Sequence, residues 1–177
     1  MKIIVVSDSH GRYSLLAQLI DMHRDADALI FLGDGINDLA RADAYSYPFT
    51  VYSVRGNCDG ISFFSQGNDA PDELVLSLGG YRFFVLHGHT RTVKHSMERA
   101  IWAAREKGAD ALLFGHTHCP TEKYLSFEDD NEDERSSKPL YVFNPGSLGA
   151  SRDGAAHFGL IQIRDGNILF SLGTLQI

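Results

Sequence analysis

The residues of this sequence that could bind metal ions stand directly after short apolar segments. Asp8 and His10, for example, follow the isoleucine and valine residues 3–6 and are separated by a single position. Side chains spaced in this way at the end of a strand lie on one side of it. One such pair is a weak indication, but similar positions recur along the chain. The full set of oxygen and nitrogen donors comprises Asp8, His10, Asp34, Asn57, His87, His116 and His118.

The chemistry of these seven donors indicates a binuclear metal site. Carboxylate, imidazole and amide groups without a thiolate suit Mn²⁺, Fe or Zn²⁺ rather than a closed cysteine site. Seven ligands are too many for one ion that keeps a position open for substrate. They suit two ions that share a bridging ligand, and only a carboxylate in this set can bridge.

The apolar segments before the first donors are predicted to be strands of one parallel sheet. Their continuous isoleucine and valine content is typical of strands that are buried on both faces. Helices are predicted between them from the spacing of apolar side chains. Active sites of such sheets lie at the carboxyl ends of the strands, where each predicted strand meets a donor. The strands are predicted over residues 2–7, 28–32 and 50–54, and the helices over 12–24 and 36–43.

The second half of the chain is predicted to be richer in strands, with hairpins at Gly79-Gly80 and Asp165-Gly166. No internal repeat or linker divides the chain, so we expect a single domain over residues 1–177. The simplest architecture is an α/β fold of two stacked sheets with helices outside, a four-layer α-β-β-α sandwich. Strands are predicted over residues 73–78, 81–86, 111–114, 122–127, 140–143, 158–163 and 167–172, and a helix over 93–107.

Composition narrows the class of protein. The 177 residues are 44% hydrophobic and 22% charged, which favours a folded globular domain. The net charge of -7 disfavours binding of extended nucleic acid, but bound cations would still attract a small phosphorylated substrate. No apolar run approaches the roughly 20 residues of a membrane span, and the start does not resemble a signal peptide. With Cys58 and Cys119 expected to be reduced, we expect a cytoplasmic protein without a membrane partner.

Five motifs, in order, resemble the signature of the calcineurin-like metallophosphoesterases. The family pattern is D-x-H, G-D, G-N-H-D/E, H and G-H-x-H, and the similarity covers residues 3 to about 118. Asn144-Pro145-Gly146-Ser147 extends it to the small YfcE-like phosphodiesterase branch, to which the retromer subunit Vps29 is related. The resemblance implies a two-sheet sandwich flanked by helices, as predicted above. The matching segments are Asp8-Ser9-His10, Gly33-Asp34, Gly56-Asn57-Cys58-Asp59, the histidines beside Gly88, and Gly115-His116-Thr117-His118.

The resemblance also implies a role for each donor. His89 competes with His87 for the same motif, and we favour His87 because it directly follows the predicted strand. Two divalent ions would activate a bridging hydroxide for in-line attack on a phosphate ester. Mn²⁺ is the expected metal, with Zn²⁺, Fe²⁺, Ni²⁺ and Mg²⁺ as alternatives. One ion would be held by Asp8, His10 and His118, the other by Asn57, His87 and His116, and Asp34 would bridge both.

Cys58 departs from the pattern of many family members, which have histidine there. A cysteine at this position resembles the YfcE-like branch and is associated with a preference for diesters over monoesters. A thiol is a poorer proton donor than an imidazolium, so we expect dependence on good leaving groups or on another acid, for which His89 is a candidate. Asp59 is expected to orient a neighbouring ligand. We therefore expect a phosphodiesterase of small diesters, with Asp34, Asn57, Cys58, Asp59 and His89 as catalytic residues.

Three other functions stay open from the sequence. A Vps29-like protein-binding scaffold with a vestigial site would tolerate losses among the donors, and none is missing. A phosphomonoesterase would use the same site, whereas the acidity of the chain disfavours a nuclease. Residues 60–72, 88–95 and 128–138 are expected to select the small phosphate-ester partner, whereas the acidic run 128–134 is expected to be a solvated hairpin tip. A homo-oligomer is left open.

Overall fold

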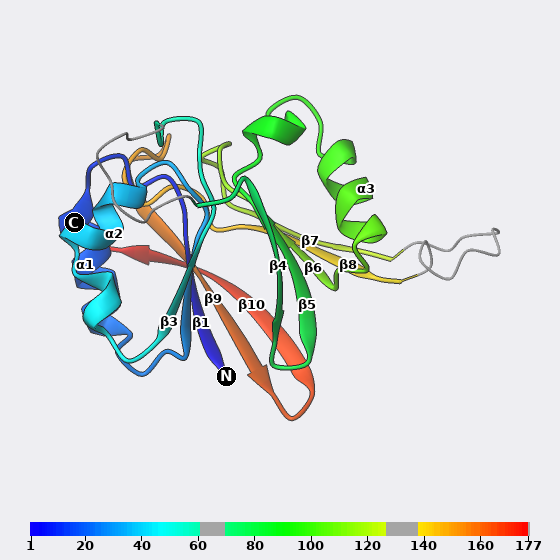
Figure 1. Cartoon of the computed structure of the whole chain (residues 1–177), viewed down its shortest axis with the longest axis horizontal. Helices are drawn as coiled ribbons and strands as arrows, with labels where there is room; N and C mark the ends of the chain where they lie inside the picture. The colour runs from blue at the N-terminus through cyan, green and yellow to red at the C-terminus, as the bar shows by residue number, and fades with distance from the viewer. Residues whose placement is uncertain (61–69, 127–137, 177) are drawn as a thin grey trace.

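The computed structural model describes residues 1–60, 70–126 and 138–176, which form two five-stranded sheets (Figure 1). The strands of the first sheet are β1 (Lys2–Val6), β2 (Ala28–Phe31), β3 (Thr50–Ser53), β9 (Ala156–Arg164) and β10 (Asn167–Leu175). They lie in the order β10-β9-β1-β2-β3. The strands β1, β2 and β3 are parallel, as predicted, and the antiparallel hairpin of β9 and β10 extends the sheet beside β1.

The second sheet has the order β4-β5-β6-β8-β7. Its strands are β4 (Glu73–Leu78), β5 (Tyr81–Leu86), β6 (Ala111–Leu113), β7 (Thr121–Leu125) and β8 (Leu140–Asn144). The central strands β5, β6 and β8 are parallel, and antiparallel strands close both edges. This is the mixed sheet that the sequence predicts.

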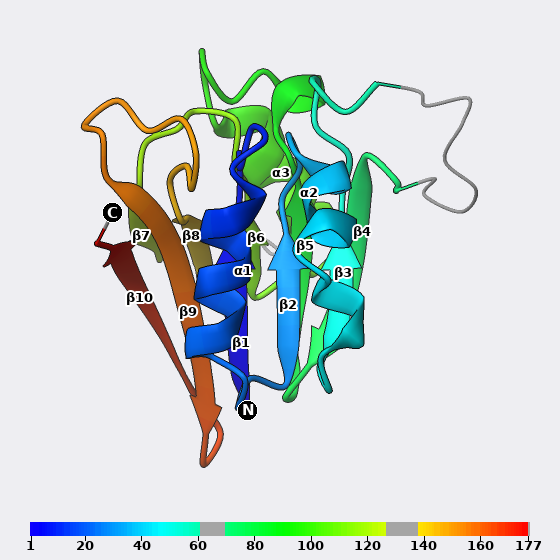
Figure 2. The same ribbon diagram turned by 90° about the vertical axis from the view of Figure 1, so that its left-hand side faces the viewer.

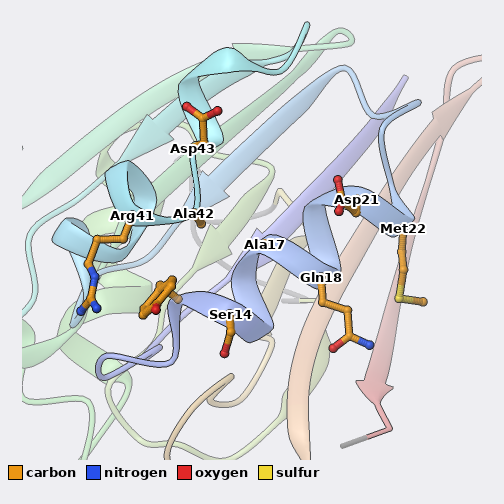
Figure 3. Close-up of a pocket in the computed structure, with 9 residues that line it drawn as sticks. Ser14, Ala17, Gln18, Asp21, Met22, Arg41, Ala42 and Asp43 are labelled. Carbon is orange, nitrogen blue, oxygen red and sulfur yellow. The ribbon is translucent and has the colours of Figure 1, made fainter.

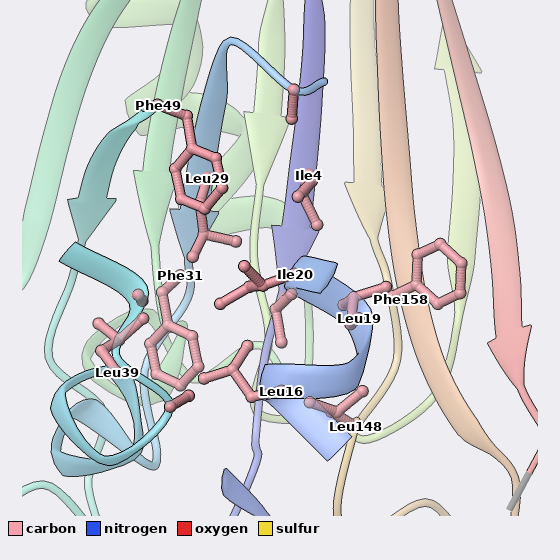
Figure 4. Close-up of a cluster of buried hydrophobic side chains, with 14 of the residues drawn as sticks. Ile4, Leu16, Leu19, Ile20, Leu29, Phe31, Leu39, Phe49, Leu148 and Phe158 are labelled. Atoms are coloured by element: carbon pink, nitrogen blue, oxygen red, sulfur yellow. The ribbon is translucent and has the colours of Figure 1, made fainter. Parts of the chain in front are cut away.

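Alternation along β1 divides its side chains between two cores. Ile3 and Val5 pack into the core between the two sheets, whereas Ile4 and Val6 face the helices on the outer side. The outer core is completed by apolar side chains from α1 (Tyr13–Met22) and α2 (Ile36–Arg41), as Figure 4 shows. Helix α3 (Glu98–Glu106) covers the second sheet with a third core. The prediction of an α-β-β-α sandwich is therefore confirmed.

The predicted helix over residues 93–107 is too long at its start. After β5 the chain forms a short 3₁₀ turn, η2 (His89–Arg91), and α3 begins only at Glu98. Residues 93–97 form turns that follow the left-handed Thr92 (φ 55°), with His95 N and Ser96 N both donating to Thr92 O. Val93 is buried beneath this turn, so its apolar character reflects core packing rather than helical periodicity.

The other boundaries differ by a few residues. The helix predicted over 36–43 ends at Arg41, because Asp43 is left-handed and leads into the 3₁₀ turn η1 (Ala44–Ser46). The terminal hairpin strands are longer than predicted. Within the part of the chain that the structure describes, every helix is too short or too polar to span a lipid bilayer.

The loops that follow the parallel strands of the two sheets come together at one end of the sandwich. Figure 2 shows the loops after β1 and β2 at the top of the view. A hydrogen bond joins the two sheets there: the backbone N–H of His116, which follows β6, donates to Oδ2 of Asp8, which follows β1, over 3.0 Å. The strand ends that carry the predicted donors therefore share one edge of the molecule.

Candidate metal centre

Asp8 lies at the centre of the first group of donors. Its side chain is fully buried, and Oδ2 accepts hydrogen bonds from Ser7 Oγ (2.5 Å) and His116 N (3.0 Å). Oδ1 is buried and accepts no hydrogen bond from the described residues. The Nε2 atoms of His118 and His10 lie 3.1 and 3.7 Å from it. An unpartnered carboxylate oxygen that faces two imidazoles fits a bound cation.

His10 and His118 complete this group. One ligand atom each from Asp8, His10 and His118 lie within 4.8 Å of one another. His118 Nδ1 is 2.8 Å from the carbonyl oxygen of Ala150, which can only accept, so Nδ1 carries the proton and Nε2 presents its lone pair to the group. The structure therefore brings together the three residues predicted for the first ion.

Asp34 lies between the two predicted sites. Its Oδ2 is 3.4 Å from His87 Nε2 and 3.9 Å from His10 Nε2, and its Oδ1 accepts a hydrogen bond from Cys58 N over 2.7 Å. Only 2% of the residue is exposed. One oxygen that faces donors of both groups has the position that a bridging ligand requires.

The second group contains Asp34, His87 and His116, whose ligand atoms also lie within 4.8 Å of one another. His87 is fully buried, and its Nδ1 donates to the carbonyl oxygen of Leu32 over 2.7 Å, which leaves Nε2 as the ligand atom. Nε2 lies 3.2 Å from Asn57 Oδ1. His116 Nδ1 is buried without a hydrogen-bond partner among the described residues, a second unsatisfied atom that a metal ion would satisfy.

Backbone conformation positions most of these donors. Asp8, His10, Asp34, His116 and His118 all have positive φ, between 44° and 66°. Residues other than glycine adopt this conformation at an energetic cost, and such residues cluster at functional sites. Each turns the chain sharply at a strand end, so that its side chain faces the shared edge of the two sheets.

Two motif glycines are required because other atoms approach them closely. A Cβ on Gly56 would lie 2.1 Å from Asp34 Oδ1, and a Cβ on Gly115 would lie 1.9 Å from Ser7 Oγ. Either methyl group would displace a carboxylate of the site or the hydroxyl that supports one. The lack of room for a Cβ therefore explains why glycine stands at position 56 in G-N and at position 115 in G-H-x-H.

The site environment shifts several pKa values in the metal-free protein. Burial would raise the pKa of Asp34, but the hydrogen bonds from His87 and Cys58 N outweigh it and lower the pKa to about 2. Burial would also raise the pKa of Asp8, but the imidazoles of His10 and His118 outweigh it and hold that pKa well below its ordinary value. Burial and the nearby positive charges of His87 and Lys94 lower the pKa of His116 to about 4. Two ionised carboxylates and a neutral imidazole are thus available for a cation at neutral pH.

Cys58 and His89 lie at the margin of the donor set. Cys58 is exposed, and its thiol forms a third close group with His10 and Asp34. Partial desolvation of the sulfur by surrounding atoms and the neighbouring Asp34 raise the pKa of the thiol to about 11. The His89 ring centroid is 5.5 Å from that of His87 and 6.2 Å from that of His116, and His89 belongs to none of the close groups found among the described residues. This geometry favours His87 over His89 as the ligand.

Asp59 supports the loop that carries Asp34. Its Oδ2 accepts from the backbone N–H of Asp34 (2.7 Å) and Gly56 (2.9 Å), and its Oδ1 accepts from Gly35 (2.7 Å) and Ile36 (2.9 Å). Both oxygens are therefore occupied by backbone donors. The arrangement agrees with an orienting role, in which Asp59 holds Asp34 through its backbone N–H.

Other residues support the loops that carry the donors; of these, Asn144 and Ser147 belong to a motif noted in the sequence, whereas Asp38 was not predicted. Asn144 Nδ2 donates to Gly115 O and Thr117 Oγ1, both over 3.0 Å, and so braces the loop that carries His116. Ser147 Oγ donates to the Asp8 carbonyl over 2.8 Å. Asp38, on α2, is buried and accepts from the loop that carries His10. An aspartate next to the apolar positions of a short helix was the only available signal for Asp38.

A shallow pocket of about 320 Å³ opens beside the donors, lined by His10, Gly11, Asp34, Gly35, Asn37, Asp38, Cys58 and Asp59. A larger groove of about 660 Å³ lies between α1 and the end of α2 (Figure 3). There the Arg41 guanidinium stacks 4.0 Å from the ring centroid of Tyr13. None of the predicted donors lines that groove, so size alone does not identify the functional site. Most of the loops predicted at 60–72 and 128–138, with the acidic run 128–134, lies outside the described residues.

Comparison with known proteins agrees with this geometry. The family model of the calcineurin-like phosphoesterase superfamily domain matches residues 1–166. The probable metallophosphoesterase YsnB of Bacillus subtilis is 30% identical over 149 residues, which are 84% of this chain and 75% of that protein. The phosphodiesterase YfcE of Escherichia coli K12 is 27% identical over 180 aligned residues, with 91% of this chain and 87% of that protein covered.

A solved structure supports the fold. The crystal structure of a conserved uncharacterized protein from Streptococcus pneumoniae TIGR4, a predicted phosphoesterase, superposes with a TM-score of 0.73 at 24% identity. The match covers 98% of this chain and 88% of that one. The two-sheet sandwich is thus shared over nearly the whole chain.

Proposed function

Because this chain belongs to the calcineurin-like phosphoesterase superfamily, we propose that it hydrolyses small phosphate diesters with the help of two divalent metal ions. The observation that carries the proposal is the place of Asp34 Oδ2, within 3.9 Å of a nitrogen donor of each group. The name of the Escherichia coli relative, a phosphodiesterase, supports the substrate class.

The residues fit the ions that the family requires, because a buried oxygen of Asp8 and a buried nitrogen of His116 lack partners among the described residues. Bound divalent ions would lower the pKa of a water molecule shared between them and neutralise the phosphoryl oxygens of the substrate. The chain holds its donors rigidly for this purpose: backbone carbonyls orient the rings of His87 and His118. Mn²⁺ is the metal we propose, since carboxylate, amide and imidazole donors suit it.

The neutral donors of the site favour a diester. Asn57 contributes an uncharged oxygen, and Cys58 is a thiol where an imidazolium would add positive charge. A diester carries one negative charge on its phosphate and a monoester close to two, so the monoester depends more on such a charge. Cys58 is exposed and lines the pocket, which supports a role for its thiol in contact with the substrate.

The test is a comparison of two chromogenic substrates with the Mn²⁺-loaded protein. We expect faster hydrolysis of a bis-aryl phosphate than of the corresponding mono-aryl phosphate, and loss of both activities after chelation. Equal or reversed rates would contradict the diesterase assignment, and no hydrolysis of either would contradict a phosphoesterase. A protein-binding scaffold is not favoured, because all seven predicted donors are present and the structure gathers them at one edge.

A further inference from the structure

We propose that Asp38 is a positioning residue that holds His10 in place as a metal ligand, an inference that rests on the function proposed above. Asp38 lies on α2 and is only 3% exposed. Its Oδ2 accepts two hydrogen bonds, from Ser9 Oγ over 2.6 Å and from the backbone N–H of Gly11 over 2.8 Å. The two donors are the residues on either side of His10.

The backbone of His10 needs such support. Its φ of 44° is in the left-handed region, where side chains other than glycine are disfavoured. The turn is closed by a hydrogen bond from Arg12 N to Ser9 O (2.9 Å), and His10 N donates to the carbonyl oxygen of Asp34 (3.1 Å). Asp38 adds the connection between this turn and the helix that follows Asp34.

The ring of His10 lacks the anchor that other histidines of the site have. The Nδ1 atoms of His87 and His118 donate to the carbonyl oxygens of Leu32 and Ala150. Among the described residues, no comparable acceptor holds the ring of His10, and 27% of its side chain is exposed. The position of its Nε2 therefore depends on the backbone, which Asp38 fixes on both sides.

Loss of the Asp38 carboxylate should affect the two ion sites unequally. Ser9 is fully buried, so its hydroxyl would lose its partner inside the protein, and the turn would relax away from the left-handed conformation. His10 Nε2 would then leave its place 3.3 Å from His118 Nε2. The group of Asp34, His87 and His116 includes no residue bonded to the Asp38 carboxylate and should be kept.

Calorimetric titration of the metal-free protein with Mn²⁺ tests this inference. For the wild type we expect two ions per chain. In Asp38→Ala we expect one ion to bind as in the wild type and the other to bind about 10- to 100-fold more weakly, the usual effect of removing a residue that orients a ligand. Asp38→Asn keeps an oxygen acceptor and should restore the lost affinity. Asp43→Ala, which removes an exposed carboxylate whose partner is Ser46, is the matched control.

Wild-type affinity for both ions in Asp38→Ala would overturn the inference, as would equal losses in Asp38→Asn and Asp38→Ala. A wild type that binds fewer than two ions would instead contradict the proposed function, so the two failures are distinct. If Asp38→Ala does not fold, Ser9→Ala removes one of the two hydrogen bonds and should weaken one ion about tenfold. Unchanged binding in Ser9→Ala would then overturn the inference.

Discussion

The Nε2 atoms of His10 and His118 lie 3.3 Å apart, although 108 positions separate the two residues in the chain. Asp8 Oδ1, which accepts no hydrogen bond from the described residues, is 3.7 Å from the first nitrogen and 3.1 Å from the second. Two ring nitrogens and a carboxylate oxygen converge in this way around a proton or a cation. Asp8 Oδ1 and the buried His116 Nδ1, neither of which has a hydrogen-bond partner among the described residues, thus both lie where the loops of the two sheets meet.

We therefore expect a divalent ion to stabilise the folded protein. Mn²⁺ at about 100 times its dissociation constant should add about 2.7 kcal/mol to the free energy of unfolding. For a chain of this length, that corresponds to a rise in Tm of roughly 5–10 °C. Differential scanning calorimetry with and without Mn²⁺ measures the shift. An unchanged Tm at saturating Mn²⁺ would show that the convergent donors do not bind the ion.

Gly56→Ala should impair metal binding, because the added methyl group would lie 2.1 Å from Asp34 Oδ1 and must displace it. We expect metal affinity to fall by at least about tenfold, and diester hydrolysis with it. Gly60→Ala is the matched control, since a Cβ at that position would have no atom within 4 Å among the described residues other than its chain neighbours. Equal metal affinity in the two variants, measured by calorimetric titration, would argue against close packing at Gly56.

Asp59→Ala should destabilise the fold, because four backbone N–H groups of the loops at 34–36 and 56 lose their acceptor. We expect a loss of about 3 kcal/mol in the free energy of unfolding. Asp59→Asn, which keeps one oxygen acceptor, should lie between it and the wild type. Urea denaturation measures both, with the exposed Asp25→Ala as control. If the free energy of unfolding fell no further in Asp59→Ala than in the control, Asp59 would not support the loop that carries Asp34.

Cys58→His should change the substrate preference rather than the fold, because Cys58 is exposed beside the pocket. An imidazole there can supply positive charge and a proton, so the ratio of monoesterase to diesterase activity should rise, by about tenfold or more. Steady-state kinetics on mono-aryl and bis-aryl phosphates gives the ratio, and Cys119→Ala should leave it unchanged. A ratio that does not move would leave Cys58 without a role in selectivity.

The donor set was predictable from the sequence because each member follows an apolar strand. Asp8, Asp34 and His87 stand where β-branched or aromatic segments end, and the structure places them within a few ångströms of one another. Parallel strands bring their carboxyl ends to one edge, so local pattern and topology specify the same place. That these residues bind metal stays a prediction.

The contacts of the supporting residues were not predictable, because their partners are distant in the sequence. Asp38 reaches back to Ser9 and Gly11, and Asn144 reaches Gly115, through contacts that exist only after both sheets have assembled. The start of α3 was misplaced for a related reason. Val93 has helical spacing relative to Met97, but it packs beneath a left-handed turn at Gly88.

The most direct test of a two-ion phosphodiesterase is the stoichiometry of its activation. Metal-free protein is titrated with Mn²⁺ well above its dissociation constant while hydrolysis of a bis-aryl phosphate is followed. The rate should rise from background to a plateau at two ions per chain, and Asp34→Asn should lower that plateau by about a hundredfold or more. A plateau at one ion, a full rate without metal, or an unchanged rate in Asp34→Asn would contradict the assignment of Asp34 as the residue that joins two metal sites.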